Sequence, residues 1–221
     1  MYKCCIFDLD GTLVNSIYAI QKSVNDTLSY WNMREISVEE SRLYVGDGYK
    51  KLLERSLIAC GDKELTHYEE AVERYQDIFR ECCMHRVEAY EGIGELLEFL
   101  KSQGIFIAVL SNKPHPRTLD NVQGVYFDLV YGEREDKGIK KKPCPDGVWA
   151  IAEELGLSKS EILYLGDTNT DMETGDNAKV DTVGVTWGFR TREELMAFHP
   201  ALIADHPSQV VQYIKDVNGI E

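Results

Sequence analysis

Hydrophobic positions along the chain follow two different patterns. Between residues 14 and 88 they recur at three- and four-residue intervals, as at Ile17, Ile20 and Val24, which is the spacing of one face of an α-helix. From Ala89 onward, short apolar runs alternate with segments of helical spacing. Strands that alternate with helices are typical of a parallel sheet with helices on both faces. The pattern therefore predicts an α/β chain that is interrupted near its start by an all-helical segment.

The predicted elements fill both regions. After a first strand that starts at Cys4, core strands are predicted over Ile105–Leu110, Asp128–Gly132, Ile162–Leu165, Thr182–Thr186 and Leu202–Ala204. Residues 14–88 contain predicted helices and no strand, and capping-box sequences begin helices at Ser37 and Thr66. We predict one α/β core domain formed by residues 1–13 and 89–221, with residues 14–88 as a helical domain inserted into it.

The first strand ends in two aspartates. Asp8 and Asp10 follow the apolar run Cys4–Phe7, and Gly11 comes directly after them. Residues i and i+2 of a strand point to the same side, so we expect both carboxylates to face one small volume. A desolvated carboxylate is costly unless it is paired or bound to a metal, and open α/β sheets bind ligands at the carboxyl ends of their strands. The stretch therefore indicates a functional site.

The sequence of this stretch, Asp8-Leu9-Asp10-Gly11-Thr12, resembles the D-x-D-G-T motif of the haloacid dehalogenase superfamily. The resemblance implies that Asp8 is a nucleophile, that Asp10 is an acid/base and that the site uses magnesium. It also implies a Rossmann-like parallel sheet core. A helical insert directly after the motif resembles the C1-capped branch of the superfamily, in which a helical-bundle cap covers the carboxyl end of the sheet.

Two later segments resemble the second and third motifs of the family. Ser111 and Asn112 follow a core strand. Taken alone the pair favours an ordinary turn, but it matches the family pattern hhh[S/T]N, and this match favours a functional role. Lys142 begins the sequence K-P-C-P, which matches K-P-x-P, within a basic segment that would otherwise be typical of a solvated charge run. The resemblance implies that Ser111, Asn112 and Lys142 bind a phosphoryl group.

A further acidic segment, G-D-T-N-T-D, ends a later core strand and contains Asp167 and Asp171. An EF-hand loop is excluded, because methionine and alanine stand where that loop requires glycine and glutamate. The segment resembles the fourth motif of the family. The resemblance implies that magnesium is bound by Asp8, Asp167 and the backbone carbonyl of Asp10. Asp171 is expected either to hold a metal-bound water or to orient Lys142.

Two more segments resemble the phosphoglycolate-phosphatase-like subgroup. One is Val183–Arg190, and the other is Val45–Leu53 in the helical insert, which contains the loop formed by Gly46, Asp47 and Gly48. Lys179 is a departure, because the subgroup more often has glycine there. We expect the loop either to reach the active site from the cap or to do no more than join two cap helices.

Charge and cysteine content narrow the range of partners. The chain has 24 basic and 38 acidic residues, a net charge of −14, so its surface repels nucleic acid and anionic membranes. No signal-peptide pattern is visible at the start, and the six cysteines form no CxxC pair, which favours reduced thiols in the cytoplasm. We expect a cytoplasmic protein, a monomer or homodimer, whose partner is a small phosphorylated metabolite.

Together these expectations predict a Mg²⁺-dependent phosphomonoester hydrolase that forms an aspartyl-phosphate and acts on a phosphoglycolate-like metabolite. One alternative is a hexose-phosphate mutase of the same superfamily, but such enzymes usually have D-G-V where this chain has Asp10–Thr12. Haloacid dehalogenases lack the second aspartate, so the presence of Asp10 argues against that activity. A non-catalytic phosphate-binding regulatory protein is expected to have lost at least one of four residues: Asp8, Asp10, Lys142 or Asp167.

Overall fold

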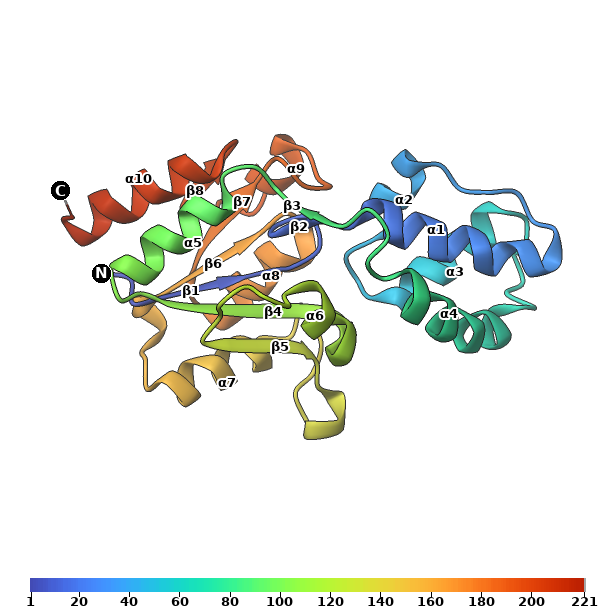
Figure 1. Cartoon of the computed structure of the whole chain (residues 1–221), viewed down its shortest axis with the longest axis horizontal. Helices are drawn as coiled ribbons and strands as arrows, with labels where there is room; N and C mark the ends of the chain where they lie inside the picture. The colour runs from blue at the N-terminus through green and yellow to red at the C-terminus, as the bar shows by residue number, and fades with distance from the viewer. Residues whose placement is uncertain (221) are drawn as a thin grey trace. The chain divides into compact units, whose positions relative to one another are not determined.

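The computed structural model describes residues 1–220, and the contacts within it divide the chain into two compact units (Figure 1). The first, called here the core unit, consists of Met1–Val14 and the chain from Ala89 onward. The second, called the helical unit, consists of Asn15–Glu88.

The core unit contains six strands of one sheet and the helices beside them. The strands are β1 (Cys4–Phe7), β4 (Phe106–Pro114), β5 (Leu129–Glu133), β6 (Ile162–Gly166), β7 (Asp181–Val185) and β8 (Leu202–Ala204). The helices are α5 (Ile93–Ser102), α6 (His115–Asn121), α7 (Asp146–Leu155), α8 (Asn169–Ala178), α9 (Arg192–Met196) and α10 (Pro207–Asn218).

The strands lie in the order β5-β4-β1-β6-β7-β8, and every neighbouring pair is parallel. β1 lies between β4 and β6, where Cys5 pairs with Ile107 on one side and with Leu163 on the other. Every residue of β1 is buried, which explains why its sequence is continuously apolar rather than alternating. The predicted α/β class with a parallel sheet is confirmed.

Helices flank the sheet. Cys4 and Ile6 of β1 pack in one apolar cluster with Val148 and Ile151 of α7 and Ala178 of α8. Helices α5 and α10 lie side by side in Figure 1 and pack against each other, and α5 also packs against β4. Helices therefore pack against the sheet.

The carboxyl ends of three neighbouring strands carry predicted site residues. Asp8 follows β1, Ser111 lies near the end of β4, and Asp167 follows β6. Because β4, β1 and β6 are parallel neighbours, these ends share one edge of the sheet.

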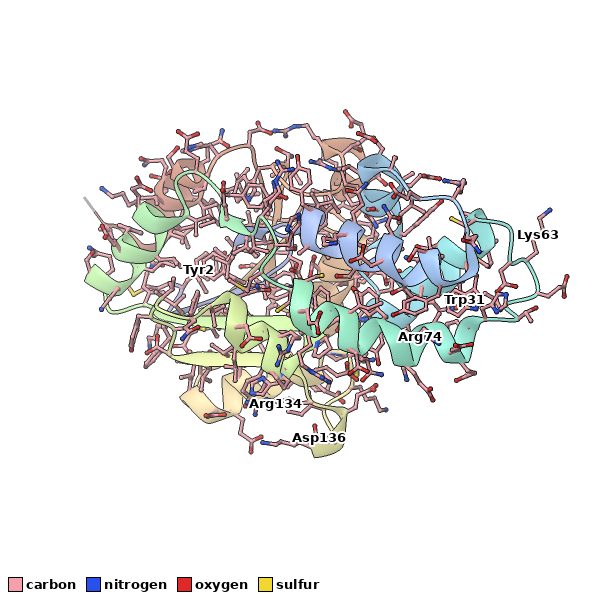
Figure 2. All side chains as sticks on the ribbon, turned by 45° about the vertical axis from the view of Figure 1, so that its right-hand side comes forward. Tyr2, Trp31, Lys63, Arg74, Arg134 and Asp136 are labelled. Atoms are coloured by element: carbon pink, nitrogen blue, oxygen red, sulfur yellow. The ribbon has the colours of Figure 1, made fainter. Side chains whose placement is uncertain are left out.

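The helical unit has its own apolar core. Its helices are α1 (Ile17–Leu28), α2 (Val38–Tyr44), α3 (Tyr49–Ala59) and α4 (Tyr68–Cys82). Val24, Leu53 and Tyr75 are buried together in this core. Trp31, labelled in Figure 2, stacks on His67 with 4.8 Å between ring centroids. The unit therefore has a core cluster separate from that of the sheet.

Some local predictions are wrong. The strands β2 (Val14–Asn15) and β3 (Glu88–Ala89) pair where only helix was expected, because two residues are too few to produce a periodic signal. Ser37 does cap α2, but Thr66 does not cap α4. Instead Asp62 accepts hydrogen bonds from the backbone N–H groups of Thr66 and the next residue, at 2.8 and 2.9 Å. Helix α9 was not predicted.

Two observations bear on the setting of the protein. Within residues 1–220, no helix combines the length and the apolar character that crossing a bilayer requires. All six cysteines are free thiols.

Candidate active site

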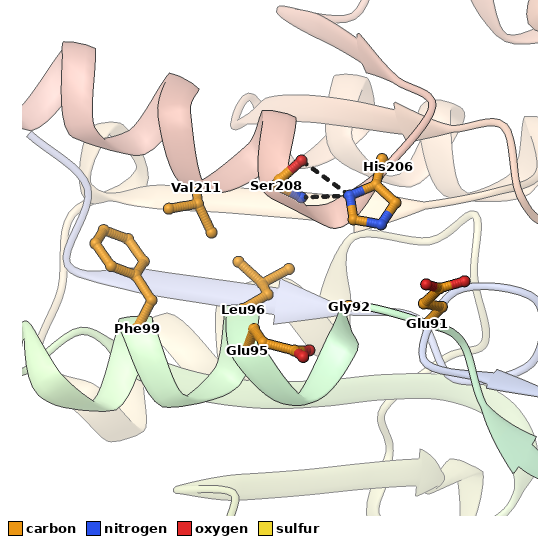
Figure 3. A pocket seen from close by; sticks show the side chains of 8 residues that line it. All are labelled: Glu91, Gly92, Glu95, Leu96, Phe99, His206, Ser208 and Val211. Carbon is orange, nitrogen blue, oxygen red and sulfur yellow. Dashed lines mark hydrogen bonds between the residues drawn. The ribbon is translucent and has the colours of Figure 1, made fainter.

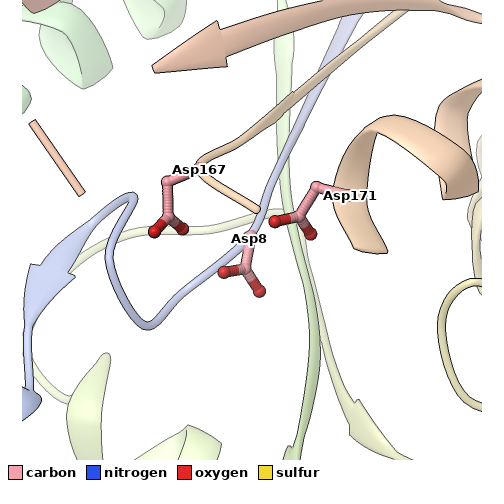
Figure 4. A group of neighbouring side chains, drawn as sticks. All are labelled: Asp8, Asp167 and Asp171. Atoms are coloured by element: carbon pink, nitrogen blue, oxygen red, sulfur yellow. The ribbon is translucent and has the colours of Figure 1, made fainter. Parts of the chain in front are cut away.

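Three buried carboxylates meet at the carboxyl edge of the sheet (Figure 4). Asp8 follows β1, Asp167 follows β6, and Asp171 lies in the first turn of α8. One oxygen atom from each side chain lies within 4.8 Å of the other two. Asp8 is 6% exposed, and the other two are fully buried. The fold thus brings together acidic residues from the first and the fourth motif.

Lys142 places a positive charge in this cluster. Its Nζ donates a hydrogen bond to Asp8 Oδ1 at 2.6 Å and another to Asp171 Oδ1 at 2.7 Å. Asn112 fixes its backbone, because Asn112 Oδ1 accepts from the Lys142 N–H at 2.9 Å and Asn112 Nδ2 donates to the Lys142 carbonyl at 3.0 Å. The second and third motifs are therefore bound to each other directly.

Asp171 accepts hydrogen bonds at both of its carboxylate oxygens. In addition to Lys142, the Tyr164 hydroxyl donates to Oδ1 at 2.9 Å. Oδ2 accepts from the Thr168 hydroxyl at 2.6 Å and from the Thr168 backbone N–H at 3.0 Å, as part of the capping box of α8. A carboxylate has about four lone-pair directions, so donors of the protein itself take up the hydrogen-bonding capacity of Asp171.

Two hydrogen bonds and two closely packed glycines fix the side chain of Asp167. The Thr12 hydroxyl donates to its Oδ1 at 3.0 Å, and the Phe189 backbone N–H donates to its Oδ2 at 2.8 Å. A Cβ atom at Gly11 would lie 2.2 Å from Asp167 Oδ2, and one at Gly188 would lie 2.4 Å from the same side chain. Both positions therefore require glycine if this carboxylate is to keep its place.

The cluster carries more negative charge than the ammonium beside it can offset. Burial raises the pKa of Asp8 to about 7, the Lys142 ammonium opposes this rise, and the Asp171 carboxylate adds to it. Burial and the charge of Asp8 raise the pKa of Asp167 well above its ordinary value. Burial alone would lower the pKa of Lys142, but the charges of Asp171 and Asp8 raise it well above its ordinary value. Lys142 therefore stays protonated, and Asp8 and Asp167 take up protons more readily than ordinary aspartates do.

These features fit a divalent cation. Carboxylate oxygens are the ligands that hard cations such as Mg²⁺ prefer, and a cation would supply the positive charge that the cluster lacks. Each oxygen of Asp167 accepts one hydrogen bond from the protein, which leaves capacity for a metal. The Asn169 side-chain oxygen, two residues further on, is buried without a hydrogen-bond partner among residues 1–220. The residues present could therefore hold a divalent metal.

Comparison with known proteins agrees with this geometry. The family model described as haloacid dehalogenase-like hydrolase matches residues 5–185. The chain belongs to this family. The expected superfamily membership is confirmed, and the relatives named below confirm that the protein is an enzyme of the phosphatase type.

Individual relatives cover nearly the whole chain. A phosphoglycolate phosphatase of Aquifex aeolicus is 34% identical, over 95% of this chain and 95% of the relative. A phosphoglycolate phosphatase of Pectobacterium atrosepticum is 27% identical, over 94% of this chain and 90% of the relative. A crystal structure from Lactobacillus delbrueckii subsp. bulgaricus has a TM-score of 0.88 at 24% identity, covering 96% of this chain and 98% of that one. The structural likeness shows a shared fold.

Other predicted residues of this hydrolase also lie at the edge of the sheet. Ser111 is buried, and its hydroxyl accepts from the Lys113 backbone N–H at 3.2 Å. Asp10 is bound by Lys113, whose Nζ lies 2.7 Å from Asp10 Oδ1. Sequence reasoning assigned no part to Lys113 or to Thr12, although both stand inside the motif segments. It also passed over Tyr164, whose position in an apolar strand gives no signal.

The loop of Gly46, Asp47 and Gly48 is ordered within the helical unit. Both glycines have positive φ, 126° and 86°. The Arg55 guanidinium of α3 forms an ion pair with Asp47 and donates to the Tyr44 carbonyl at 2.7 Å. These contacts join the loop to the helices on either side of it. The role of the loop at the active site stays a prediction.

The core unit also has a cavity of about 390 Å³ between α5 and α10 (Figure 3). Its apolar wall includes Leu96, Phe99 and Val211, and Glu95 and His206 lie on its polar side. None of the predicted site residues lines it. The cavity is therefore distinct from the acidic cluster.

Proposed function

We propose that the protein is a Mg²⁺-dependent phosphomonoester hydrolase that acts on a small phosphorylated metabolite through an aspartyl-phosphate intermediate. The observation that carries this proposal is the buried Asp8 carboxylate, with Lys142 Nζ at 2.6 Å and further carboxylates beside it. A carboxylate that is held next to a lysine and a potential metal site can act as a nucleophile towards phosphorus. The phosphatase names of the relatives support the same reaction.

Asp8 must be ionised when it attacks phosphorus. Asp8, Asp167 and the Asp10 backbone carbonyl would hold Mg²⁺, which would supply positive charge to the site. Lys142 contributes a second positive charge, which favours the ionised form of Asp8 and balances the developing charge on the phosphoryl oxygens. Both cations therefore offset the tendency of the buried Asp8 to take up a proton.

Asp10 acts as the acid and then as the base in this scheme. It protonates the leaving oxygen as the phosphorus–oxygen bond breaks, and later takes a proton from the water that hydrolyses the aspartyl-phosphate. Its side chain is 16% exposed, compared with 8% for Asp8, so it is the more accessible of the two carboxyl groups.

The remaining residues position these groups. Asp171, whose oxygens accept from Lys142 and from other protein donors, orients Lys142 rather than ligating the metal directly. Ser111 donates from its hydroxyl to the phosphoryl group. Asn112 contributes through its two hydrogen bonds to the Lys142 backbone, in addition to any contact with phosphate.

The names of the relatives favour phosphoglycolate, or a compound like it, as the substrate. We assign the role of a cap to the helical unit, because it is inserted directly after the segment that carries Asp8 and Asp10. An aspartyl-phosphate must be protected from uncontrolled hydrolysis, which is a task for a cap that can exclude water.

Phosphate release from 2-phosphoglycolate tests the proposal, measured with Mg²⁺ and with excess EDTA. We expect Asp8→Asn to abolish turnover, because an amide is a poor nucleophile, while the folded structure is kept. Asp176→Asn is the matched control, since Asp176 is an aspartate of the same unit whose side chain is 74% exposed. Substantial turnover by Asp8→Asn would remove Asp8 from the nucleophile role, and turnover unaffected by EDTA would exclude a metal-dependent mechanism.

A further inference from the structure

A second lysine is buried at the active site. Lys113 lies near the end of β4, its side chain is 4% exposed, and its Nζ is 2.7 Å from Asp10 Oδ1. Lys142, the lysine of the family motif, has the same side-chain exposure but binds Asp8 and Asp171. The two lysines therefore serve different carboxylates, and the proposed phosphoryl-transfer steps require only Lys142.

The Lys113 ammonium forms an ion pair with Asp10, the carboxyl group proposed as the acid and base of the reaction. Both kinds of donor hold carboxylates elsewhere in the site: the Thr12 hydroxyl binds Asp167, whereas the Lys142 ammonium binds Asp8 and Asp171. Burying an ammonium carries a desolvation cost that a hydroxyl largely avoids. The Lys113 ammonium bears this cost beside Asp10, where its positive charge can also bind an anionic group of the substrate.

We propose that Lys113 is a specificity-determining residue that binds a carboxylate of the substrate, on the leaving-group side of the phosphate. The inference rests on the proposed phosphatase function and names its substrate class: phosphate esters of small hydroxy acids. In this arrangement Lys142 binds the phosphoryl group of the substrate, and Lys113 binds its carboxylate.

The geometry supports this assignment. Asp10 delivers a proton to the leaving oxygen, so the group bound to Asp10 lies beside the leaving group. In a phosphorylated 2-hydroxy acid only one carbon separates the leaving oxygen from the carboxyl group. An ammonium has three donors, enough to hold Asp10 and a substrate carboxylate together. In a chain of net charge −14, a substrate with a second anionic group requires such local positive charge.

The test compares two substrates that differ beyond the leaving oxygen: 2-phosphoglycolate, which carries a carboxylate, and 2-hydroxyethyl phosphate, which carries a hydroxyl. Lys113→Met keeps much of the side-chain length and removes the charge. We expect kcat/KM for 2-phosphoglycolate to fall about 10- to 100-fold more than kcat/KM for 2-hydroxyethyl phosphate, the range expected for a hydrogen bond to a charged group. Effects through Asp10, and losses of folded protein, act on both substrates and cancel in the ratio.

Two further variants serve as controls for the comparison of the two substrates. Lys113→Gln provides a neutral replacement that can still hydrogen-bond, should the methionine variant fold poorly, and we expect the same change in the ratio. Lys3→Met removes a lysine of the same unit that pairs with Glu161 at 2.6 Å on the surface, and we expect it to leave the ratio unchanged. If both Lys113 variants lower kcat/KM equally for the two substrates, or leave it unchanged, Lys113 does not bind the carboxylate and the proposal is overturned.

A binding measurement separates this inference from the proposed function. Calorimetry on Asp8→Asn protein, with and without Lys113→Met, compares the affinity for 2-phosphoglycolate with that for inorganic phosphate. A selective loss of 2-phosphoglycolate affinity supports the role of Lys113, even if the wild-type protein hydrolyses neither ester and the proposed function fails. An unchanged preference overturns the role of Lys113, whatever the hydrolysis assay shows.

Discussion

Magnesium affinity should depend steeply on pH, because the cation and a proton compete for the same carboxylate. Burial raises the pKa of Asp8 to about 7 in the absence of metal. A group with that pKa is about 97% protonated at pH 5.5 and about 10% protonated at pH 8. Since the metal binds the ionised form, its apparent affinity should be about 30-fold lower at pH 5.5 than at pH 8. Asp167, whose pKa is also raised, acts in the same direction.

The same shift determines how stability depends on pH. An aspartate of the unfolded chain has a pKa of about 3.9, whereas that of Asp8 in the folded protein is about 7. Between these values the folded state binds more protons than the unfolded state, so the free energy of unfolding of the metal-free protein should fall as pH rises. The stabilisation is complete below the lower value and lost above the upper one. Mg²⁺ should have the opposite pH dependence and raise stability more at pH 8 than at pH 5.5.

Isothermal titration calorimetry at the two pH values measures the affinity, and buffers of different ionisation enthalpy report the protons released. Thermal unfolding with and without Mg²⁺ gives the second readout. Asp167→Ala should weaken binding sharply at both pH values, and Asp171→Ala should weaken it less, because Asp171 already accepts four hydrogen bonds from the protein. Affinities that agree within about threefold at the two pH values, without proton release, would refute the competition between metal and proton.

Two further predictions concern Lys142 and the loop of the helical unit. Lys142→Met should lower the free energy of unfolding in EDTA by about 3–5 kcal/mol, because it leaves buried carboxylates without the ammonium that pairs with them. Chemical denaturation measures this loss, and Lys3→Met, which breaks a solvent-screened surface ion pair, is the control. A loss no larger than that of Lys3→Met would contradict the prediction. Gly46→Pro or Asp47→Ala should change the ranking of substrates across a panel of phosphorylated metabolites and leave the Mg²⁺ dependence of activity unchanged. If both variants keep the wild-type ranking, the loop only connects two helices.

Much of the core unit could be predicted because its signals are local. β1 and β6 are buried on both faces, so their apolar runs are conspicuous, and each ends abruptly in an aspartate. Strand β4 was predicted to end at Leu110 but continues to Pro114, because its last residues are polar groups of the site rather than apolar groups of the core. The apolar pattern that predicts a strand therefore fails where the strand carries polar residues of the candidate site.

The partners of each side chain could not be predicted in this way. In the sequence, Asn112 is simply the residue after Ser111, and only the fold shows that both ends of its amide bind the Lys142 backbone. Gly188 stands in the segment Val183–Arg190, whose resemblance to the subgroup does not reveal that a Cβ atom at Gly188 would lie 2.4 Å from the Asp167 side chain. Such contacts join segments far apart in the chain, and hydrophobic spacing contains no information about them.

Asp171 shows how this limit affects a functional assignment. The resemblance leaves two roles open for it, to hold a metal-bound water or to orient Lys142. The structure surrounds Asp171 with the Lys142 ammonium, the Tyr164 hydroxyl and the Thr168 capping groups, which together supply four donors. Asp167 accepts only two hydrogen bonds from the described chain. This difference in hydrogen-bonding capacity, rather than the position of either residue in the motif, supports the proposal that Asp167 binds the metal and that Asp171 orients Lys142.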